Sequence, residues 1–286
     1  MGTSESFSGP KRPLLPSDFD EDLDKILHLP FELLSPNNPD SENNEENVNQ
    51  EEREDAEGNQ NNIPSWRSTK TRIARYANGQ TDNYRPVLSS YVKSHGGARN
   101  ASKTSKAGIY TTIRFGYFLD NVSKSGIHKY LEENHIEYEG RKASDILSEI
   151  INNIAPSPDT KEDAIARNAL LDTMQELLEK FNLSGDIEIL NNMNGNNINY
   201  ILATYISSYI YHRILSDLEM RFEKYSKSPK EAKRKEKDIK EYISGTVEGV
   251  IKKINPSQYN YTKSSIKKLI TDLYYGCYKA IEGDMK

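Results

Sequence analysis

Apolar residues recur at helical spacing through most of the chain after Ile63, with few of the strict alternations that predict strands. Prolines, glycines and asparagines separate the periodic segments from one another. These segments predict an all-α fold, a bundle of about six to eight helices. Their approximate ranges are 85–94, 106–122, 127–134, 143–154, 160–181, 198–225, 229–255 and 263–281.

The sequence also contains clear helix-start signals. Thr160, or Asp159 before it, can cap a helix, with an acidic residue three positions further on as the reciprocal partner. Ser228 and Pro229 give a second helix a cap and a first-turn proline. The segment 198–225 is apolar nearly all round in its first half, and this predicts a buried helix at the centre of the bundle.

The first 62 residues differ in composition from the remainder. From Ser17 to Asn62 the chain has 15 acidic and 2 basic residues and is rich in asparagine. Such a segment cannot bury enough apolar surface to offset its chain entropy. We therefore predict a long disordered acidic N-terminal tail over residues 1–62 and a helical domain over residues 63–286.

One short apolar patch, from Leu23 to Leu34, interrupts this tail. Leu29, Phe31 and Leu34 within it are too apolar for a plain linker. They are either incidental or part of a linear motif that docks on a partner or on the protein's own core, and the residues leave both interpretations open.

The N-terminus offers an unusual chemical group. Because Gly2 follows Met1, we expect the methionine to be trimmed, leaving an unhindered α-amine. An α-amino pKa is about 7.7–8.0, so part of this amine is neutral and nucleophilic at cellular pH. An amine on a long tail fits a group that is presented to another enzyme. The opening also matches the loose myristoylation pattern, but no basic cluster follows to supply a second membrane signal.

The densest basic region runs from Arg67 to Arg114, with Asp82 as its single acid and tyrosines between the cations. This pattern suits nucleic-acid phosphates together with base stacking. It suits an acidic protein surface equally well, including the chain's own tail, and a plain solvated surface also has this composition. The candidate binding residues are Arg67, Arg72, Arg75, Arg99, Lys103 and Lys106.

We find no catalytic constellation and no metal-ligand spacing among the five histidines. The loop from His95 to Lys103 lacks a phosphate-binding glycine motif and is interpreted as a glycine hinge between helices. Cys277 lies on an apolar stripe and is predicted to be a core residue. The charged run 230–240 is interpreted as a solvated helix face. The sequence therefore predicts a non-enzymatic protein without metal or cofactor.

The same features favour the cytoplasm. A single cysteine cannot form a disulfide within the chain, which suits a reducing compartment. No apolar run approaches the ~20 residues of a membrane span, and no secretory signal is evident.

Three stretches of the sequence resemble the QatB family of bacterial Qat anti-phage systems. The first is the opening MGTSESFSGPKRPLLPSDFDEDL, which contains Gly2, Thr3, Ser4, Gly9 and Pro10. The second and third are SSYVKSHGGARNASKTSKAG and EDAIARNALLDTMQEL. They occur in the family's order along the chain.

This resemblance implies partners and a chemistry. The partners are a QueC-like enzyme, an ATPase and a TatD-like nuclease. QueC-type enzymes activate the carboxylate of a deazaguanine with ATP, and related defence enzymes use the amine of a protein's N-terminal glycine, here Gly2. The enzyme's channel would then recognise Thr3, Ser4 and the turn at Gly9 and Pro10.

Two functions follow as hypotheses. The first is a helical scaffold or adaptor whose N-terminal tail is bound and modified by the QueC-like partner. The alternative is a nucleic-acid-binding helical protein that acts through residues 67–114.

Overall fold

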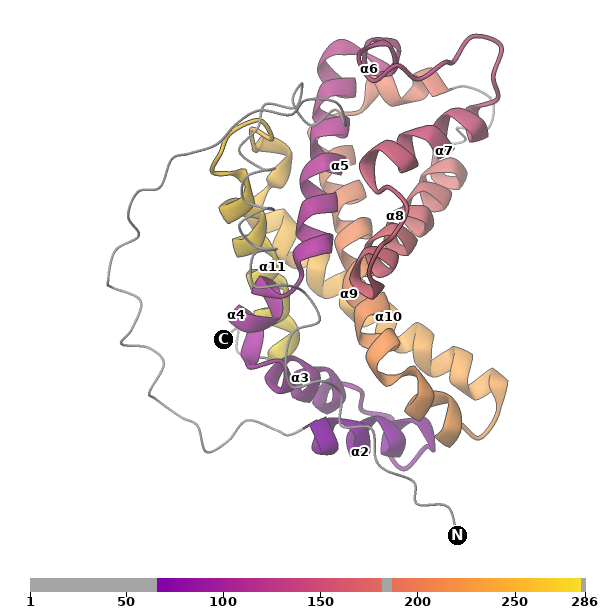
Figure 1. Cartoon of the computed structure of the whole chain (residues 1–286). Coiled ribbons are helices and arrows are strands. Elements are labelled where there is room, and N and C mark those ends of the chain that lie inside the picture. The colour runs from indigo at the N-terminus through magenta and orange to yellow at the C-terminus, as the bar shows by residue number, and fades with distance from the viewer. Residues whose placement is uncertain (1–65, 182–186, 284–286) are drawn as a thin grey trace, which may run out of the picture. The chain divides into compact units, whose positions relative to one another are not determined.

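The regular structure is helical throughout the residues described by the computed structural model, 66–181 and 187–283 (Figure 1). These residues belong to one compact unit, Glu51–Lys286. The helices are α2 (Trp66–Ala77), α3 (Arg85–Ser94), α4 (Gly97–Lys103), α5 (Lys106–Ser125), α6 (Ile127–Glu133), α7 (Ala143–Ile154), α8 (Lys161–Lys180), η3 (Ile187–Asn192), α9 (Gly195–Tyr225), α10 (Pro229–Ile254), η4 (Pro256–Gln258) and α11 (Ile266–Glu282). The predicted all-α class is confirmed, while the predicted tail lies outside the described residues.

The eight predicted helices correspond to α3 and α5–α11, whereas the α-helices α2 and α4 and the short 3-10 helices η3 and η4 were not predicted. Helix α2 buries Thr69, Ile73, Tyr76 and Ala77, and only some of these are apolar enough to mark a stripe in the sequence. Helix α4 has only 7 residues, which is too short for a helical period to stand out. Residues 97–103 are therefore helical and do not form a loop.

The predicted caps are present. The Thr160 side chain accepts a hydrogen bond from the backbone of Asp163 at 3.1 Å, and the Asp163 carboxylate accepts one from the Thr160 backbone at 3.0 Å. Ser228 accepts from the backbone of Glu231 at 3.2 Å, with Pro229 in the first turn of α10. These bonds satisfy backbone donors that a helix start leaves unpaired.

Helix α9 is the central element, as its apolar first half predicts. It packs against α2, α5, α8 and α10, and in Figure 1 it runs between α8 and α10. Its Tyr205 and Tyr209 are completely buried. Helix α11 packs against α3, α4, α5 and α10 and completes the core on another side of the unit.

Two glycines of α5 allow tyrosine rings to approach the helix backbone. Tyr209 of α9 lies over Gly108, and Tyr261 lies over Gly116 so closely that a Cβ at Gly116 would overlap the ring. The Tyr261 hydroxyl donates to the Pro256 carbonyl at 3.1 Å, which holds the ring in place. The packing of α5 therefore depends on the absence of a Cβ atom at Gly108 and Gly116.

We expect Gly116→Ala to lower the free energy of unfolding by about 1–3 kcal/mol, because overpacking forces side chains and backbone to shift. The matched control is Gly245→Ala in α10, where an added Cβ meets nothing within 4 Å. There alanine should raise the free energy of unfolding by about 0.5–1 kcal/mol. Urea unfolding followed by circular dichroism measures both, and equal stability of the two variants would contradict the packing described.

Candidate functional site

The predicted sites in the tail lie outside the described residues. They are the modification site Gly2 and the partner-binding residues Thr3, Ser4, Gly9, Pro10, Leu29, Phe31 and Leu34. Their roles therefore remain predictions.

The basic region divides into two surfaces. Arg67, Arg72 and Arg75 lie on α2. The other three candidates, Arg99, Lys103 and Lys106, lie on α4 and at the start of α5. Helix α3 packs against both α2 and α4 and lies between them in Figure 1. The six candidate residues, close in sequence, therefore do not form one site.

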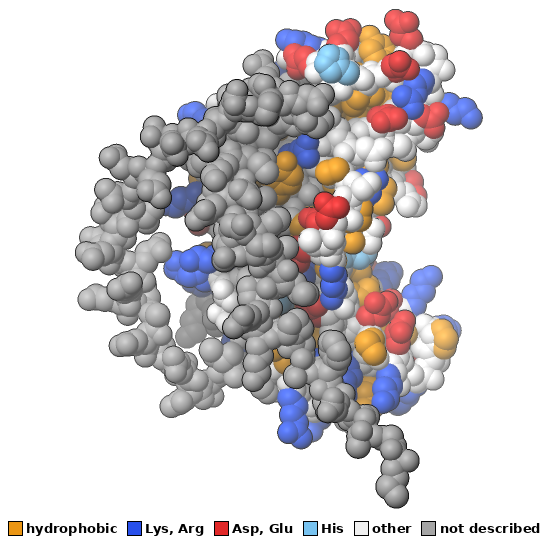
Figure 2. Space-filling view, viewed as in Figure 1, with side chains coloured by type: hydrophobic (Ala, Val, Ile, Leu, Met, Phe, Trp, Pro, Cys, Tyr) orange, Lys and Arg blue, Asp and Glu red, His pale blue; other side chains and the backbone are white. Residues whose placement is uncertain are grey.

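The surface of α2 is a shallow groove of cations and hydroxyls. It is lined by Arg67, Ser68, Thr71, Arg72 and Arg75. The three arginines are exposed, and none forms an ion pair with another residue of the described ranges. Figure 2 shows Lys and Arg side chains at the end of the helical unit that α2 occupies.

The second surface includes residues of α11 that sequence reasoning missed. The Arg99 guanidinium and the Lys279 ammonium each lie 5.6 Å from the centre of the Tyr275 ring. Burial, and then the nearby Lys267, lower the pKa of Lys106. Because α11 follows α4 by more than 150 residues, only the fold brings these side chains together.

The main buried polar network centres on Arg213 of α9, whose side chain is 7% exposed. Its guanidinium donates to the Ala101 carbonyl at 2.9 Å and to the Tyr278 hydroxyl at 3.1 Å. It also donates to Ser105 Oγ at 2.5 Å, and it lies 3.9 Å from the Glu162 carboxylate. The network fixes the junction of α4 and α5 to α8, α9 and α11.

One turn further along α9, Asp217 holds α3 and α8. It accepts a hydrogen bond from the Tyr91 hydroxyl at 3.0 Å and pairs with Lys161 at 3.0 Å, while His95 Nε2 lies 3.7 Å away. Burial would raise the pKa of Asp217, but these polar neighbours outweigh it and lower that pKa to about 2. The carboxylate is thus ionised and engaged at neutral pH, so it is poorly suited to accept or donate a proton.

Ser208, Asp172 and His212 have the residue types of a catalytic triad but the wrong order in space. Ser208 Oγ donates to Asp172 Oδ2 at 3.2 Å, and His212 Nε2 lies 2.7 Å from the same oxygen. In a triad the imidazole stands between serine and carboxylate, where it can take the serine proton. Here the carboxylate stands between them, and Ser208 is buried. The arrangement links α8 to α9 and provides no activated nucleophile.

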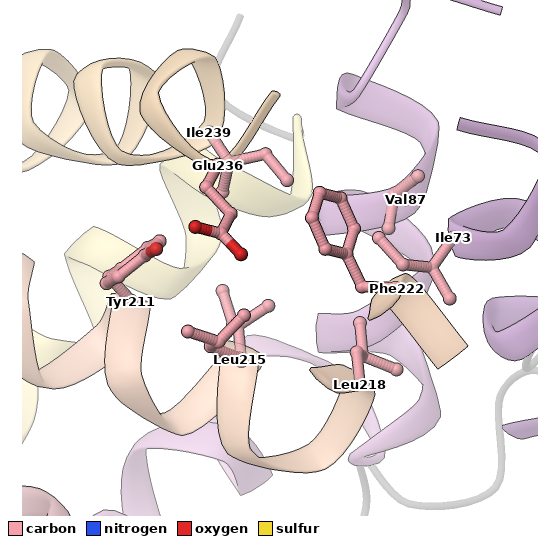
Figure 3. Close-up of a pocket in the computed structure, with 9 residues that line it drawn as sticks. Ile73, Val87, Tyr211, Leu215, Leu218, Phe222, Glu236 and Ile239 are labelled. Atoms are coloured by element: carbon pink, nitrogen blue, oxygen red, sulfur yellow. The ribbon is translucent and has the colours of Figure 1, made fainter. Parts of the chain in front are cut away.

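An apolar pocket lies between α2, α3, α9 and α10 (Figure 3). Glu236 places its carboxylate near Leu215 at this pocket. Burial raises the pKa of Glu236, and the neighbouring Glu219 and Glu223 add to the effect. The pocket was missed because its lining comes from four separate helices. That lining consists of Ile73, Val87, Tyr211, Ile214, Leu215, Leu218, Phe222, Glu236 and Ile239.

The prediction of a solvated face for residues 230–240 was wrong at Lys235. This lysine is completely buried, with its ammonium 3.3 Å from Asp82 and 4.3 Å from the centre of the Tyr76 ring. Lys235 precedes Ile239 and Ile243 at intervals of four residues, so helical geometry places it on the buried face of α10.

The prediction for Cys277 is confirmed, and the predicted glycine hinge is confirmed only at Gly96 and Gly97, since residues 97–103 form α4. Cys277 is completely buried, and burial raises the pKa of its thiol to about 12. Gly96 and Gly97, with φ of 86° and 84°, turn the chain from α3 into α4, in a conformation that glycine adopts at little cost.

Among the described residues, no group of three or more His, Cys, Asp or Glu could hold a metal ion, and no helix could span a membrane.

Together the fold and its surfaces define an all-α protein with exposed arginine-rich and lysine-rich faces. The family model described as Qat anti-phage system associated protein QatB matches residues 96–281. The chain therefore belongs to the QatB family, and it is a component of an anti-phage defence system, which confirms the resemblance of its sequence. The match covers α4 to α11 and begins after α2 and α3. No curated protein and no solved structure matches the chain.

Proposed function

We propose that this protein is a non-enzymatic scaffold or adaptor of its Qat system, and that a QueC-like partner enzyme binds its N-terminal tail and modifies it at Gly2. The observation that carries this proposal is membership of the QatB family over residues 96–281. The Gly2-Thr3-Ser4 opening supplies the group to be modified.

The proposed reaction is acyl transfer to the glycine amine. ATP and the carboxylate of a deazaguanine form an acyl adenylate and release pyrophosphate. The neutral amine of Gly2 attacks the acyl carbon, an amide bond forms, AMP leaves and the amine gives up one proton. Because glycine has no side chain, its amine meets the least steric hindrance, and the partner enzyme supplies proximity.

The tail and the helical unit have separate roles in this proposal. If residues 1–62 are disordered as predicted, the tail has a root-mean-square span of roughly 40–50 Å and reaches an active site at a distance. The helical unit then provides the fixed surfaces that hold the partners. The ATPase and the TatD-like nuclease are further proposed partners, and the cytoplasm is the proposed location.

Deletion of residues 1–16 tests the recognition of the tail. We expect co-purification with a tagged QueC-like partner to be lost, because the deletion removes Gly2, Thr3, Ser4, Gly9 and Pro10. Deletion of residues 35–50 removes the same length of chain from the acidic linker and should leave co-purification intact. Circular dichroism checks that both variants keep the helical unit. A stable complex with the protein that lacks residues 1–16 would refute recognition through the leader.

A further inference from the structure

We infer that the exposed face of α2, formed by Arg67, Arg72 and Arg75 with Ser68 and Thr71, binds the phosphate backbone of a nucleic acid. These five residues line one groove on the surface of a single helix. The inference is independent of the proposed modification of Gly2.

The opposite face of α2 packs into the core and bonds to α3, so the helix that carries the cations is held rigidly. Ile73 and Tyr76 are buried in the core. Thr69 Oγ1 forms hydrogen bonds with Ser90 Oγ at 2.5 Å and Ser94 Oγ at 2.8 Å, and both partners lie on α3. A site on a rigid helix loses less conformational entropy on binding than one on a loop.

The charges on this face are costly for the helix itself. Helix α2 has no acidic residue in its first turn, and Arg67 lies near the N-terminal end, where a cation is unfavourable with the helix dipole. Arg72 and Arg75 are like charges three residues apart, as are Arg67 and Lys70, and α2 contains no acidic residue to offset them. Because no acidic residue of the described ranges pairs with these arginines, a ligand that neutralises them is the better explanation of the face.

The chemistry and the dimensions of the face fit a polyphosphate. Arginine presents a planar fork of donors that matches phosphate geometry, and hydroxyls and cations supply most contacts to nucleic-acid backbones. The eight residue-to-residue steps from Arg67 to Arg75 rise about 12 Å, the axial length of roughly three to four nucleotides of one strand. The groove offers cations and hydroxyls, and the contacts that such groups make to phosphates carry no sequence information. We therefore expect binding with little sequence preference.

The test uses the full-length protein and labelled 20-nucleotide oligomers in fluorescence anisotropy, with duplex DNA, single-stranded DNA and single-stranded RNA as separate arms. We compare the wild type with a variant carrying Arg67→Gln, Arg72→Gln and Arg75→Gln. The control carries Arg221→Gln, Lys230→Gln and Lys233→Gln, which removes the same charge from exposed positions of α9 and α10.

We expect salt-dependent binding by the wild type in at least one arm, and the arm that binds most tightly identifies the nucleic acid. The α2 variant should bind at least about 10-fold more weakly, and the slope of log K against log salt should fall in magnitude by about 2–3, for three lost phosphate contacts. Its thermal stability should equal or exceed that of the wild type.

Three results would overturn the inference. One is no binding in any arm at micromolar protein and about 50 mM salt, where phosphate contacts are strong. Another is an equal loss of affinity in the control variant, since this would reflect net charge alone. The third is binding of poly-glutamate with the same dependence on the three arginines, which would assign the face to an acidic protein.

Discussion

Replacing Arg213 by alanine is expected to lower the free energy of unfolding by about 3–5 kcal/mol, because several buried polar groups lose their hydrogen-bond donor at once. The substitution removes the donor that Ser105, Tyr278 and the Ala101 carbonyl share, and all three are buried. It also leaves the Glu162 carboxylate without its cation. Urea unfolding followed by circular dichroism gives the free energy directly.

The control for this prediction lies on the same helix. Arg221 is exposed on α9, and Arg221→Ala should change the free energy of unfolding by no more than about 0.5 kcal/mol. If the two alanine variants unfold at the same urea concentration with the same slope, the Arg213 network does not stabilise the junction of α4 and α5.

Substitution of Gly2 is expected to have the largest functional effect. Gly2→Leu should retain Met1 and abolish the modified form, because the enzyme then meets a different and bulkier terminus. Gly2→Ala still permits trimming, yet its added methyl group should reduce modification by about 10²-fold, as a small misplacement of a reacting group does. Peptide mass spectrometry after co-expression with the QueC-like partner measures the modified fraction.

A matched change elsewhere in the tail separates the amine from general effects of the tail. Asn43→Leu introduces the same side chain within the acidic linker and should leave the modified fraction unchanged. Efficient modification of the Gly2→Leu variant would show that the partner does not require the glycine amine.

Local signals in the sequence predicted much of the fold. The caps at Thr160 and Ser228 depend on residues three positions away, so the sequence contains all the information they need. The apolar first half of α9 likewise predicted its central place. The start of α9 was less predictable, since Asn194 caps it and the helix begins at Gly195, three residues before the predicted range.

Contacts between distant residues account for what the sequence did not predict. Arg213 resembles any helix cation until α4, α5 and α11 surround it. Lys235 is buried because Asp82 and Tyr76, more than 150 residues earlier, reach its ammonium. The basic region was continuous in sequence but divides where α3 separates α2 from α4. Positions along a chain do not specify which helix faces meet.

Modification at Gly2 is decided by the intact mass of the wild-type protein, purified with and without co-expression of the QueC-like partner. If Gly2 is the acceptor, co-expression adds one acyl group, carried by the N-terminal peptide, and protein produced alone has only the mass of the chain trimmed of Met1. A terminus that keeps the trimmed mass in cells where the complete system blocks phage would refute modification at Gly2.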